Sequence, residues 1–290
     1  MLLRWVVTQA VRVAAEKGVV QAVSQFGPTT SNDPAQPPMA EEVPPCDVAF
    51  IFPLAVESDA LANRLEQSKT TKCATFLEHA GTLEGRRVVV ANSGIGAAAT
   101  ARATADVIAI HRPSWVIAAG FAAALKDDVR RGHVVMPSQV VDGSRELEIG
   151  LKIDPDSAAA TGGLHVGRLL CVSEMLRSEQ EKRVLGEEHD ALAYDMETIE
   201  VAAVCRQNKT RFLAVRLVTD SLRDQLPKEM ETLVQQKSFA GKLGAATGAI
   251  FKRPSAVKDM WKLKEDAIRA SDKLAGFLVG VLPSLCADAP

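Results

Sequence analysis

Short runs of consecutive apolar residues recur along the middle of the chain and alternate with segments of helical periodicity. Such runs are typical of strands buried on both faces of a sheet, whereas apolar positions three and four residues apart indicate amphipathic helices. Strands are predicted at 46–54, 75–79, 86–91, 115–119, 132–141, 169–173, 191–194 and 212–218. Helices are predicted at 55–65, 97–111, 174–188 and 199–207, with a polar loop and one hairpin at 142–167. The alternation predicts a three-layer α/β/α domain around a central mixed, mostly parallel sheet.

Two segments precede this domain, which we place at 46–285. Residues 1–26 have the pattern of an amphipathic helix, but charged residues interrupt its apolar positions too often for a membrane span or a signal peptide. Residues 27–45 contain many prolines and hardly any bulky apolar residue, which is typical of a linker. We expect the tethered helix to dock on its own domain or on a partner, with a membrane surface as the alternative.

The C-terminal part of the chain has a different composition. Residues 227–256 form an insertion in which glycines at spacings of three and four are interleaved with apolar residues. That composition suits either a mobile cover over a site or a close helix contact. From Ser255 to Leu282 the pattern is amphipathic again, and we expect a final helix packed on the sheet.

Composition excludes some classes of function. The chain of 290 residues has a net charge of −2, which argues against a nucleic-acid-binding protein, because such a protein needs a basic face. Its five cysteines are scattered without a C-x-x-C pair, so we expect reduced thiols in a cytoplasmic protein. The five histidines show no metal-ligand spacing, and we predict neither a metal nor an organic cofactor.

Polar and small residues gather where the predicted strands end. Asp220 follows the strand 212–218, and Glu57 lies in the first turn of the helix after the first strand. Ser93-Gly94-Ile95-Gly96 and Gly120–Ala124 are predicted as tight turns of small residues, which let backbone approach a ligand closely. Ligands of α/β sheets bind outside the carboxyl ends of the strands, so these residues are expected to share one cleft. On position alone, Asp220 is either a catalytic acid or a helix cap, and Glu57 is either functional or a residue favoured by the helix dipole.

These motifs also occur in a characteristic order. Along the chain they are Glu57, Ser93-Gly94-Ile95-Gly96, Ala119-Gly120, Asp195-Met196-Glu197 and Arg216-Leu217-Val218-Thr219-Asp220. The Met-Glu pair followed by Arg-x-x-[Ser/Thr]-Asp is the most specific of them, and the glycine turns are not specific. In this order, over residues 46–223, the sequence resembles the nucleoside phosphorylase and nucleosidase superfamily. It is most similar to the 5′-methylthioadenosine/S-adenosylhomocysteine nucleosidases and related bacterial phosphorylase-superfamily proteins.

The resemblance implies a purine nucleosidase that releases adenine from a nucleoside with a 5′ substituent. In this family the aspartate matching Asp220 protonates N7 of the leaving purine, and the glutamate matching Glu57 positions the attacking water. Glu197 matches the glutamate that accepts hydrogen bonds from the ribose 2′- and 3′-hydroxyls, and Met196 matches the thioether that lies against the sugar. Arg216 resembles the arginine of this strand, for which structural ion pairing is the expected role.

The same resemblance implies further contacts and partners. Substrate contacts are expected at Gly120, Phe121, Ser173, Ser93 and Gly94, with a base platform around 172–176. A small-molecule nucleoside is the expected ligand, nucleic acid is not, and a homodimer is expected in which the partner closes the 5′ pocket. We expect a cytoplasmic location, and the helix 1–26 leaves peripheral membrane contact open.

Two departures from the family pattern concern the nucleophile and the substrate. Phosphorolytic relatives hold phosphate with arginines, but the matching stretches 53–57 and 116–120 contain none, so we expect water as the nucleophile. Phe121 stands where the methylthioadenosine nucleosidases usually carry a serine. With a lid formed by 227–256, this predicts a large apolar 5′ group, as in relatives that release adenine during hopanoid-lipid synthesis.

Two alternatives remain at this point. Within enzymes, a phosphate-dependent nucleoside phosphorylase is the alternative. From another class, the chain is a catalytically inactive protein that binds nucleosides. The presence of Glu57, Glu197 and Asp220 together in family order argues against the inactive protein.

Overall fold

A computed structural model describes residues 43–150, 162–224 and 254–286. The predicted helix 1–26, the linker up to residue 42 and most of the insertion 227–256 lie outside the described residues. Among the helices that are described, none is both long enough and apolar enough to cross a membrane.

The described residues form one sheet of ten strands with helices on its faces. The strands are β1 (Val48–Phe52), β2 (Glu66–Lys72), β3 (Leu77–Leu83), β4 (Arg86–Asn92), β5 (Trp115–Ala124), β6 (Val134–Val141), β7 (Glu146–Glu148), β8 (Leu164–Cys171), β9 (Ala191–Asp195) and β10 (Arg211–Asp220). The helices are α2 (Ala55–Ala62), α3 (Ala97–His111), α5 (Glu179–Glu188), α6 (Thr198–Gln207) and α9 (Pro254–Cys286).

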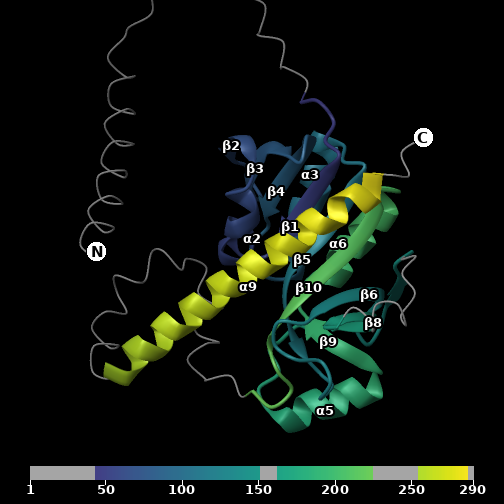
Figure 1. Cartoon of the computed structure of the whole chain (residues 1–290). Helices are drawn as coiled ribbons and strands as arrows, with labels where there is room; N and C mark the ends of the chain where they lie inside the picture. The colour runs from purple at the N-terminus through teal and green to yellow at the C-terminus, as the bar shows by residue number, and fades with distance from the viewer. Residues whose placement is uncertain (1–42, 151–161, 225–253, 287–290) are drawn as a thin grey trace, which may run out of the picture. The chain divides into compact units, whose positions relative to one another are not determined.

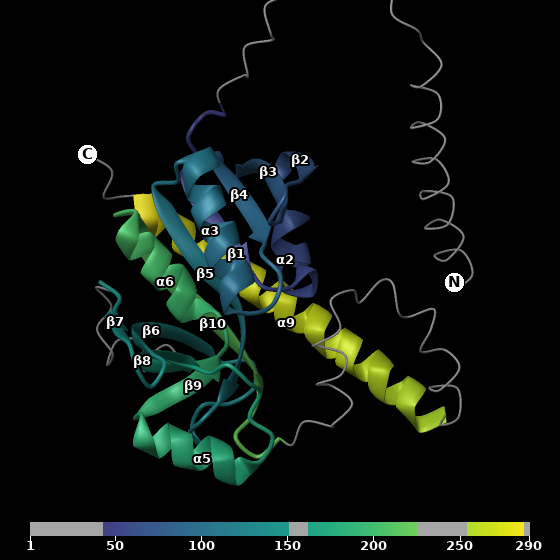
Figure 2. The ribbon, with the colours of Figure 1, turned by 180° about the vertical axis from the view of Figure 1, so that it is seen from behind.

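Strand β1 lies at the centre and shows why the domain has three layers. It is buried along its whole length and pairs in parallel with β4 and β5. Because side chains alternate across a strand, Val48, Phe50 and Phe52 pack with the apolar residues of α2 and α9. Ala49 and Ile51 face the other way and pack with those of α3 and α6. Figures 1 and 2, which view opposite faces, show α9 across one side of the sheet and α3 and α6 across the other.

The sheet closes on itself at one end, which the sequence pattern did not predict. Strand β5 pairs with β10 in parallel and with β9 in an antiparallel direction, while β6 and β8 join β10 to β9. The first half of β5 therefore belongs to the open part of the sheet, and its second half belongs to a closed ring of five strands. The whole sheet is mixed, as predicted, with parallel pairing at its centre.

Several predicted boundaries were wrong. Gly120–Ala124 is no tight turn but the second half of β5, because β10 pairs with Gly120 to Ala123 and β9 pairs with Ala123 and Ala124. The predicted loop 142–167 does contain a hairpin, formed by β6 and β7, but β8 already starts at Leu164. The exposed, polar strand β2 was not predicted at all, since it has no apolar run.

The helix predicted from residue 174 begins only at Glu179. Its start is set by a capping box, in which the Ser178 hydroxyl accepts a hydrogen bond from the Glu181 amide at 3.1 Å and the Glu181 carboxylate accepts one from the Ser178 amide at 3.1 Å. Residues 174–178 are consequently free to form the loop that follows β8.

The final helix was predicted correctly as an element that packs on the sheet. Helix α9 buries Leu274, Leu278 and Leu282 completely against the cluster that contains β1 and α2. The Ser271 hydroxyl also donates to the backbone carbonyl of Glu57 at 3.1 Å. Helix α9 thus helps to hold the first turn of α2 in place.

Candidate functional site

Glu57 joins the start of α2 to β5. Its side chain is buried, with 5% of its surface exposed, in the first turn of the helix. One carboxylate oxygen, Oε1, accepts a hydrogen bond from the Phe121 amide at 3.0 Å, and Oε2 accepts one from the Leu54 amide at 3.0 Å. The same carboxylate therefore satisfies an amide at the helix start and reaches across to β5.

The burial of Glu57 sets its protonation. Burial raises the pKa of its carboxyl to about 7, although the Phe121 amide and the Arg216 guanidinium favour the charged form. The charge of Glu197 raises the pKa of Glu57 further. A carboxyl with a pKa near 7 can exchange a proton at neutral pH, as a general base or acid must.

Glu197 lies at the junction of β9 and α6. It is 6% exposed, and its Oε1 accepts a hydrogen bond from the Gly96 amide at 3.1 Å. Burial, followed by the charge of Asp195, raises the pKa of Glu197 to about 7, while Arg216 and nearby amides oppose the change. The glycine-rich turn after β4 thus contributes a backbone donor to this carboxylate, made accessible by a positive φ of 97° at Gly96.

Arg216 is held in the interior by a dense set of polar contacts. It is 1% exposed; its Nη2 forms an ion pair with Asp195 Oδ2 at 2.7 Å and donates to Thr198 Oγ1 at 2.7 Å. Thr198 in turn donates to Asp195, and the Cys171 thiol donates to the other Asp195 oxygen at 2.7 Å. These contacts confirm the ion-pairing role expected for Arg216.

Arg216 Nη1 is the exception in this network, because it has no hydrogen-bond partner among the described residues. It lies against Gly120, where an added Cβ would collide with Nη1 and come within 3.2 Å of Glu57 Oε1. Only glycine at position 120 leaves room for both the Glu57 carboxylate and the Arg216 guanidinium beside β5.

Asp220 is the last residue of β10 and lies half-buried at its carboxyl end. The Thr219 hydroxyl donates to Asp220 Oδ2 at 2.8 Å. Asp220 pairs with Ala123 of β5, after an irregularity in register that follows Val218. Residues 221–224 form a turn and not a helix, so within the described structure Asp220 does not cap a helix.

Asp220 and Arg216 therefore mark two positions along the same pair of strands. Arg216 pairs with Gly120, next to Glu57, whereas Asp220 pairs with Ala123. Three residues of β10 lie between them, and because of the irregularity their partners on β5 are three residues apart, about 10 Å along the strand. Glu57 and Glu197 thus lie near Arg216, and Asp220 lies further along the same two strands.

The predicted base platform lies at the Asp220 position. Val172 and Leu176 pack in one apolar cluster with Ala123 and Tyr194. The Tyr194 hydroxyl donates to the Leu176 carbonyl at 3.3 Å, which fixes the loop after β8. Ser173 is exposed on this loop, and Met196 is half-buried between β9 and α6.

Ser93 directly follows β4, at the start of the glycine-rich turn. Its buried hydroxyl donates to the Gly94 carbonyl at 2.9 Å and lies 3.1 Å from the Thr100 hydroxyl. The side chain thus connects the end of β4 to α3. Gly94, with a positive φ of 80°, makes the turn that brings Gly96 to Glu197.

Sequence reasoning overlooked the residues that hold the site together. Asp195 and Thr198 fix Arg216, and Gly96 contacts Glu197 directly. Asp195 was visible as the first residue of the Asp-Met-Glu triplet, but its partner could not be inferred before the register of β10 was known. In the described part of the chain, no group of three or more His, Cys, Asp or Glu side chains is arranged to hold a metal ion.

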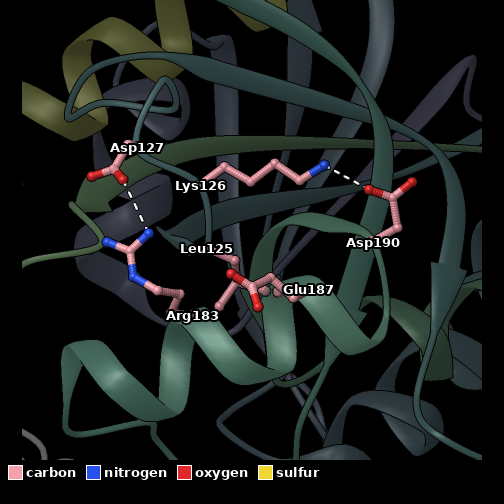
Figure 3. Close-up of a pocket in the computed structure, with 7 residues that line it drawn as sticks. Leu125, Lys126, Asp127, Arg183, Glu187 and Asp190 are labelled. Carbon is pink, nitrogen blue, oxygen red and sulfur yellow. Dashed lines mark hydrogen bonds and ion pairs between the residues drawn. The ribbon is translucent and has the colours of Figure 1, made fainter.

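A separate surface hollow lies beside α5 (Figure 3). It has a volume of about 390 Å³ and is lined by Leu125, Lys126, Asp127, Arg183, Gly186, Glu187 and Asp190. Two ion pairs, Lys126–Asp190 at 2.7 Å and Arg183–Asp127 at 3.1 Å, occupy its wall. None of the predicted site residues lines this hollow.

Comparisons with known proteins agree with the resemblance in the sequence. The 5′-methylthioadenosine/S-adenosylhomocysteine nucleosidase of Colwellia psychrerythraea is 27% identical over 203 residues, which cover 60% of this chain and 84% of that protein. One similar structure is a mutant of the Helicobacter pylori enzyme MTAN, solved with 5′-methylthioadenosine in the active site. It matches with a TM-score of 0.63 at 15% identity, and the match covers 82% of this chain and 99% of that chain.

The nucleosidase of Neisseria meningitidis, in complex with methylthio-immucillin-A, has a TM-score of 0.61 at 21% identity, with 82% and 99% of the two chains covered. At these identities the structural likeness establishes the fold. The model of one protein family, the phosphorylase superfamily, matches residues 47–253. Since this match spans most of the described sheet and both buried glutamates, the chain belongs to the phosphorylase superfamily.

Proposed function

We propose that this protein is a nucleosidase that hydrolyses the N-glycosidic bond of a purine nucleoside, releasing adenine from a nucleoside with a 5′ substituent. The main support is the pair of buried glutamates, Glu57 and Glu197, each with a pKa raised to about 7 beside Arg216. The nucleosidases among the relatives supply the reaction class.

Glu57 is proposed to position and deprotonate the attacking water. Its two backbone hydrogen bonds use one acceptor site on each oxygen, and a carboxylate has further lone pairs available. With a pKa of about 7, it is largely ionised just above neutral pH and still basic enough to accept a proton from water as the bond to C1′ forms.

Glu197 is proposed to hold the ribose. Gly96 fixes one of its oxygens and leaves the carboxylate able to accept bonds from the 2′- and 3′-hydroxyls. A buried negative charge beside the sugar also stabilises the positive charge that develops on the ribose as the glycosidic bond breaks. Met196, at the same junction, is proposed to lie against the sugar.

Asp220 is proposed to donate the proton that N7 of the purine receives, so that the base leaves neutral while C1′ gains the hydroxyl of water. Its position beside Ala123 and the apolar cluster of Val172 and Leu176 supports a base bound at this end of the edge. Ser173, Gly120 and the Phe121 backbone are proposed substrate contacts along the same edge. Ser93 and Gly94 are proposed to act through the turn that presents Gly96.

Water is the proposed nucleophile in preference to phosphate. Arg216, the cation beside Glu57, is already paired with Asp195, and a phosphate dianion would meet two further buried carboxylates. Base release should therefore proceed at the same rate with and without phosphate in the buffer. Strict dependence on phosphate would make the protein a phosphorylase instead.

The acid assignment has its own test. We expect Asp220→Asn to lower the rate of adenine release about 10²–10⁴-fold, because the amide cannot donate a proton to N7 at neutral pH. Binding of free adenine, measured by calorimetry, should change little. A variant as active as the wild type would refute the acid role, and a wild-type protein that binds nucleosides but releases no base would be the inactive binder.

The finer substrate proposal concerns the 5′ group. Phe121 is half-buried and packs against the core cluster, and Leu54 is 38% exposed beside Glu57. These apolar side chains support a large apolar 5′ substituent, such as the lipid chain of a hopanoid-linked adenosine. Adenine release should be faster from a lipid-linked adenosine than from methylthioadenosine, and preference for the small substrate would refute this proposal.

Assembly and location are proposed from the resemblance alone. We propose a cytoplasmic homodimer, with residues 1–26 and 27–45 as a helix and linker ahead of the catalytic domain 46–285, and the 227–256 insertion as a lid. Light scattering of the full chain tests the dimer. Sedimentation with anionic lipid vesicles tests membrane contact of the N-terminal helix.

A further inference from the structure

Lys182 of α5 is a completely buried lysine, with 0% of its surface exposed. Its ammonium nitrogen Nζ donates to the backbone carbonyl of Ser221 at 3.1 Å and to that of Asp224 at 2.8 Å. Both carbonyls belong to the turn that directly follows Asp220. Figures 1 and 2 show α5 beside the end of β10 in both views.

A buried ammonium has an energetic cost that an apolar side chain of similar length would avoid. Burial lowers the pKa of Lys182, while the charges of Asp220 and Asp224 raise it and that of Arg131 lowers it. The carboxylates of Asp220 and Asp224 therefore compensate part of the cost of burial. The Lys182 ammonium joins α5 to the turn that follows Asp220, the proposed acid.

The turn after Asp220 has further anchors besides Lys182, since the Leu222 side chain is buried, with 2% of its surface exposed. Asp224 Oδ2 accepts a hydrogen bond from the Ser221 amide at 2.6 Å and one from Arg131 Nε at 2.8 Å. The Asp224 amide closes the turn on the Ser221 carbonyl at 3.2 Å. Lys182 contacts both ends of this turn, so it sets where the turn begins, and with it the direction of the preceding residue.

Helix α5 also follows the loop that carries the base platform. Ser178, the N-cap of α5, comes two residues after Leu176, which packs with Tyr194 and Ala123. The helix that supplies Lys182 is therefore tied to the apolar surface proposed for the purine. Lys182 thus connects this helix to the turn that follows β10.

We propose that Lys182 is a positioning residue that aligns Asp220 with the purine by holding the Ser221–Asp224 turn on α5. The inference deepens the proposed function and depends on it for its kinetic test. Misplacing a catalytic group by about 1 Å costs on the order of 10²-fold in rate, so loss of this anchor should affect turnover more than binding.

The test compares Lys182→Met with wild type in the full chain, measuring kcat and KM for adenine release. We expect kcat to fall about 10–100-fold with KM changed less than about threefold.

Amide hydrogen exchange provides a readout that does not require activity. In Lys182→Met, the amides of 221–224 should exchange faster, while those of β1 stay protected. Lys126→Met is the matched control, because Lys126 is a half-buried lysine that pairs with Asp190 and contacts none of these carbonyls. It should leave kcat and the exchange of 221–224 unchanged.

The outcomes separate the two proposals. If wild type releases no adenine, the proposed function fails, whatever Lys182 does. If wild type is active and folded Lys182→Met keeps the wild-type kcat, the positioning role is overturned. If Lys182→Met does not fold, Lys182→Gln takes its place. Faster exchange of the amides of 221–224 together with a wild-type kcat in that variant overturns the role.

Discussion

Replacing Glu57 with glutamine removes one charge from the centre of the site and preserves its shape. In the wild type, burial raises the pKa of this carboxyl from 4.5 to about 7. At 1.36 kcal/mol per pH unit, such a shift corresponds to about 3 kcal/mol of pH-dependent stability. The native state binds the proton more tightly than the unfolded state, so this contribution is complete below pH 4.5 and is lost as the pH rises through 7.

The substitution has a second, pH-independent effect. Both oxygens of Glu57 accept backbone amides at 3.0 Å, and a glutamine must place its NH₂ group against one of them. An unpaired buried amide costs about 1–3 kcal/mol. We therefore expect Glu57→Gln to be less stable than wild type at pH 5 and to approach wild-type stability at pH 8, with the difference closing by about 2–3 kcal/mol.

Urea unfolding of both proteins at several pH values between 5 and 8 measures this difference. Glu66→Gln, at an exposed position of β2, is the control and should run parallel to wild type. The same Glu57→Gln protein should lose about 10²–10⁴-fold in kcat, and wild-type kcat should rise with pH through about 7 as the base ionises. Parallel stability curves for Glu57→Gln and wild type would show that the carboxyl does not titrate near neutrality in the folded protein, and the reasoning would then be wrong.

Two further substitutions test how the site is held. Gly120→Ala places a Cβ against Arg216 Nη1 and 3.2 Å from Glu57 Oε1. We expect strain to lower the free energy of unfolding by about 1–3 kcal/mol in urea and to lower kcat for adenine release. Full activity would mean that the two side chains can move apart. Asp195→Asn leaves the buried charge of Arg216 without its partner at 2.7 Å. We expect the free energy of unfolding to fall by about 3–5 kcal/mol in the same assay. A fall below about 1 kcal/mol would contradict a tightly coupled pair.

Much of the fold was predictable because its signals are local. The apolar runs of β1, β4 and β10 and the alanine-rich helix α3 lie where the sequence pattern placed them. A strand buried on both faces needs an unbroken apolar run, which can be recognised from a few consecutive residues. Strand β2 was missed for the same reason, since its residues are exposed and polar and only its pairing with β3 makes it a strand.

The course of β5 shows where local signals fail. The sequence Gly120 to Ala124 has the small residues of a turn, yet it forms extended strand because β10 and β9 both pair with it. Hydrogen bonds from two neighbours determine the conformation of residues with weak preferences of their own. Lys182 is a parallel case, because a charged helix predicts a solvated face until another segment covers one of its lysines.

The sequence by itself determined which carboxylates stand at strand ends, their order along the chain, and the family to which that order belongs. Only the tertiary structure decided what surrounds each of them. Glu57 and Glu197 acquire pKa values near 7 through burial and through a neighbouring carboxylate, which is Glu197 for Glu57 and Asp195 for Glu197. Arg216 is brought to Asp195 by the register of β10. Desolvation and Coulomb interactions depend on distances between residues far apart in the chain. Residue types therefore suggest which residues form a site, but the packed structure determines their pKa values.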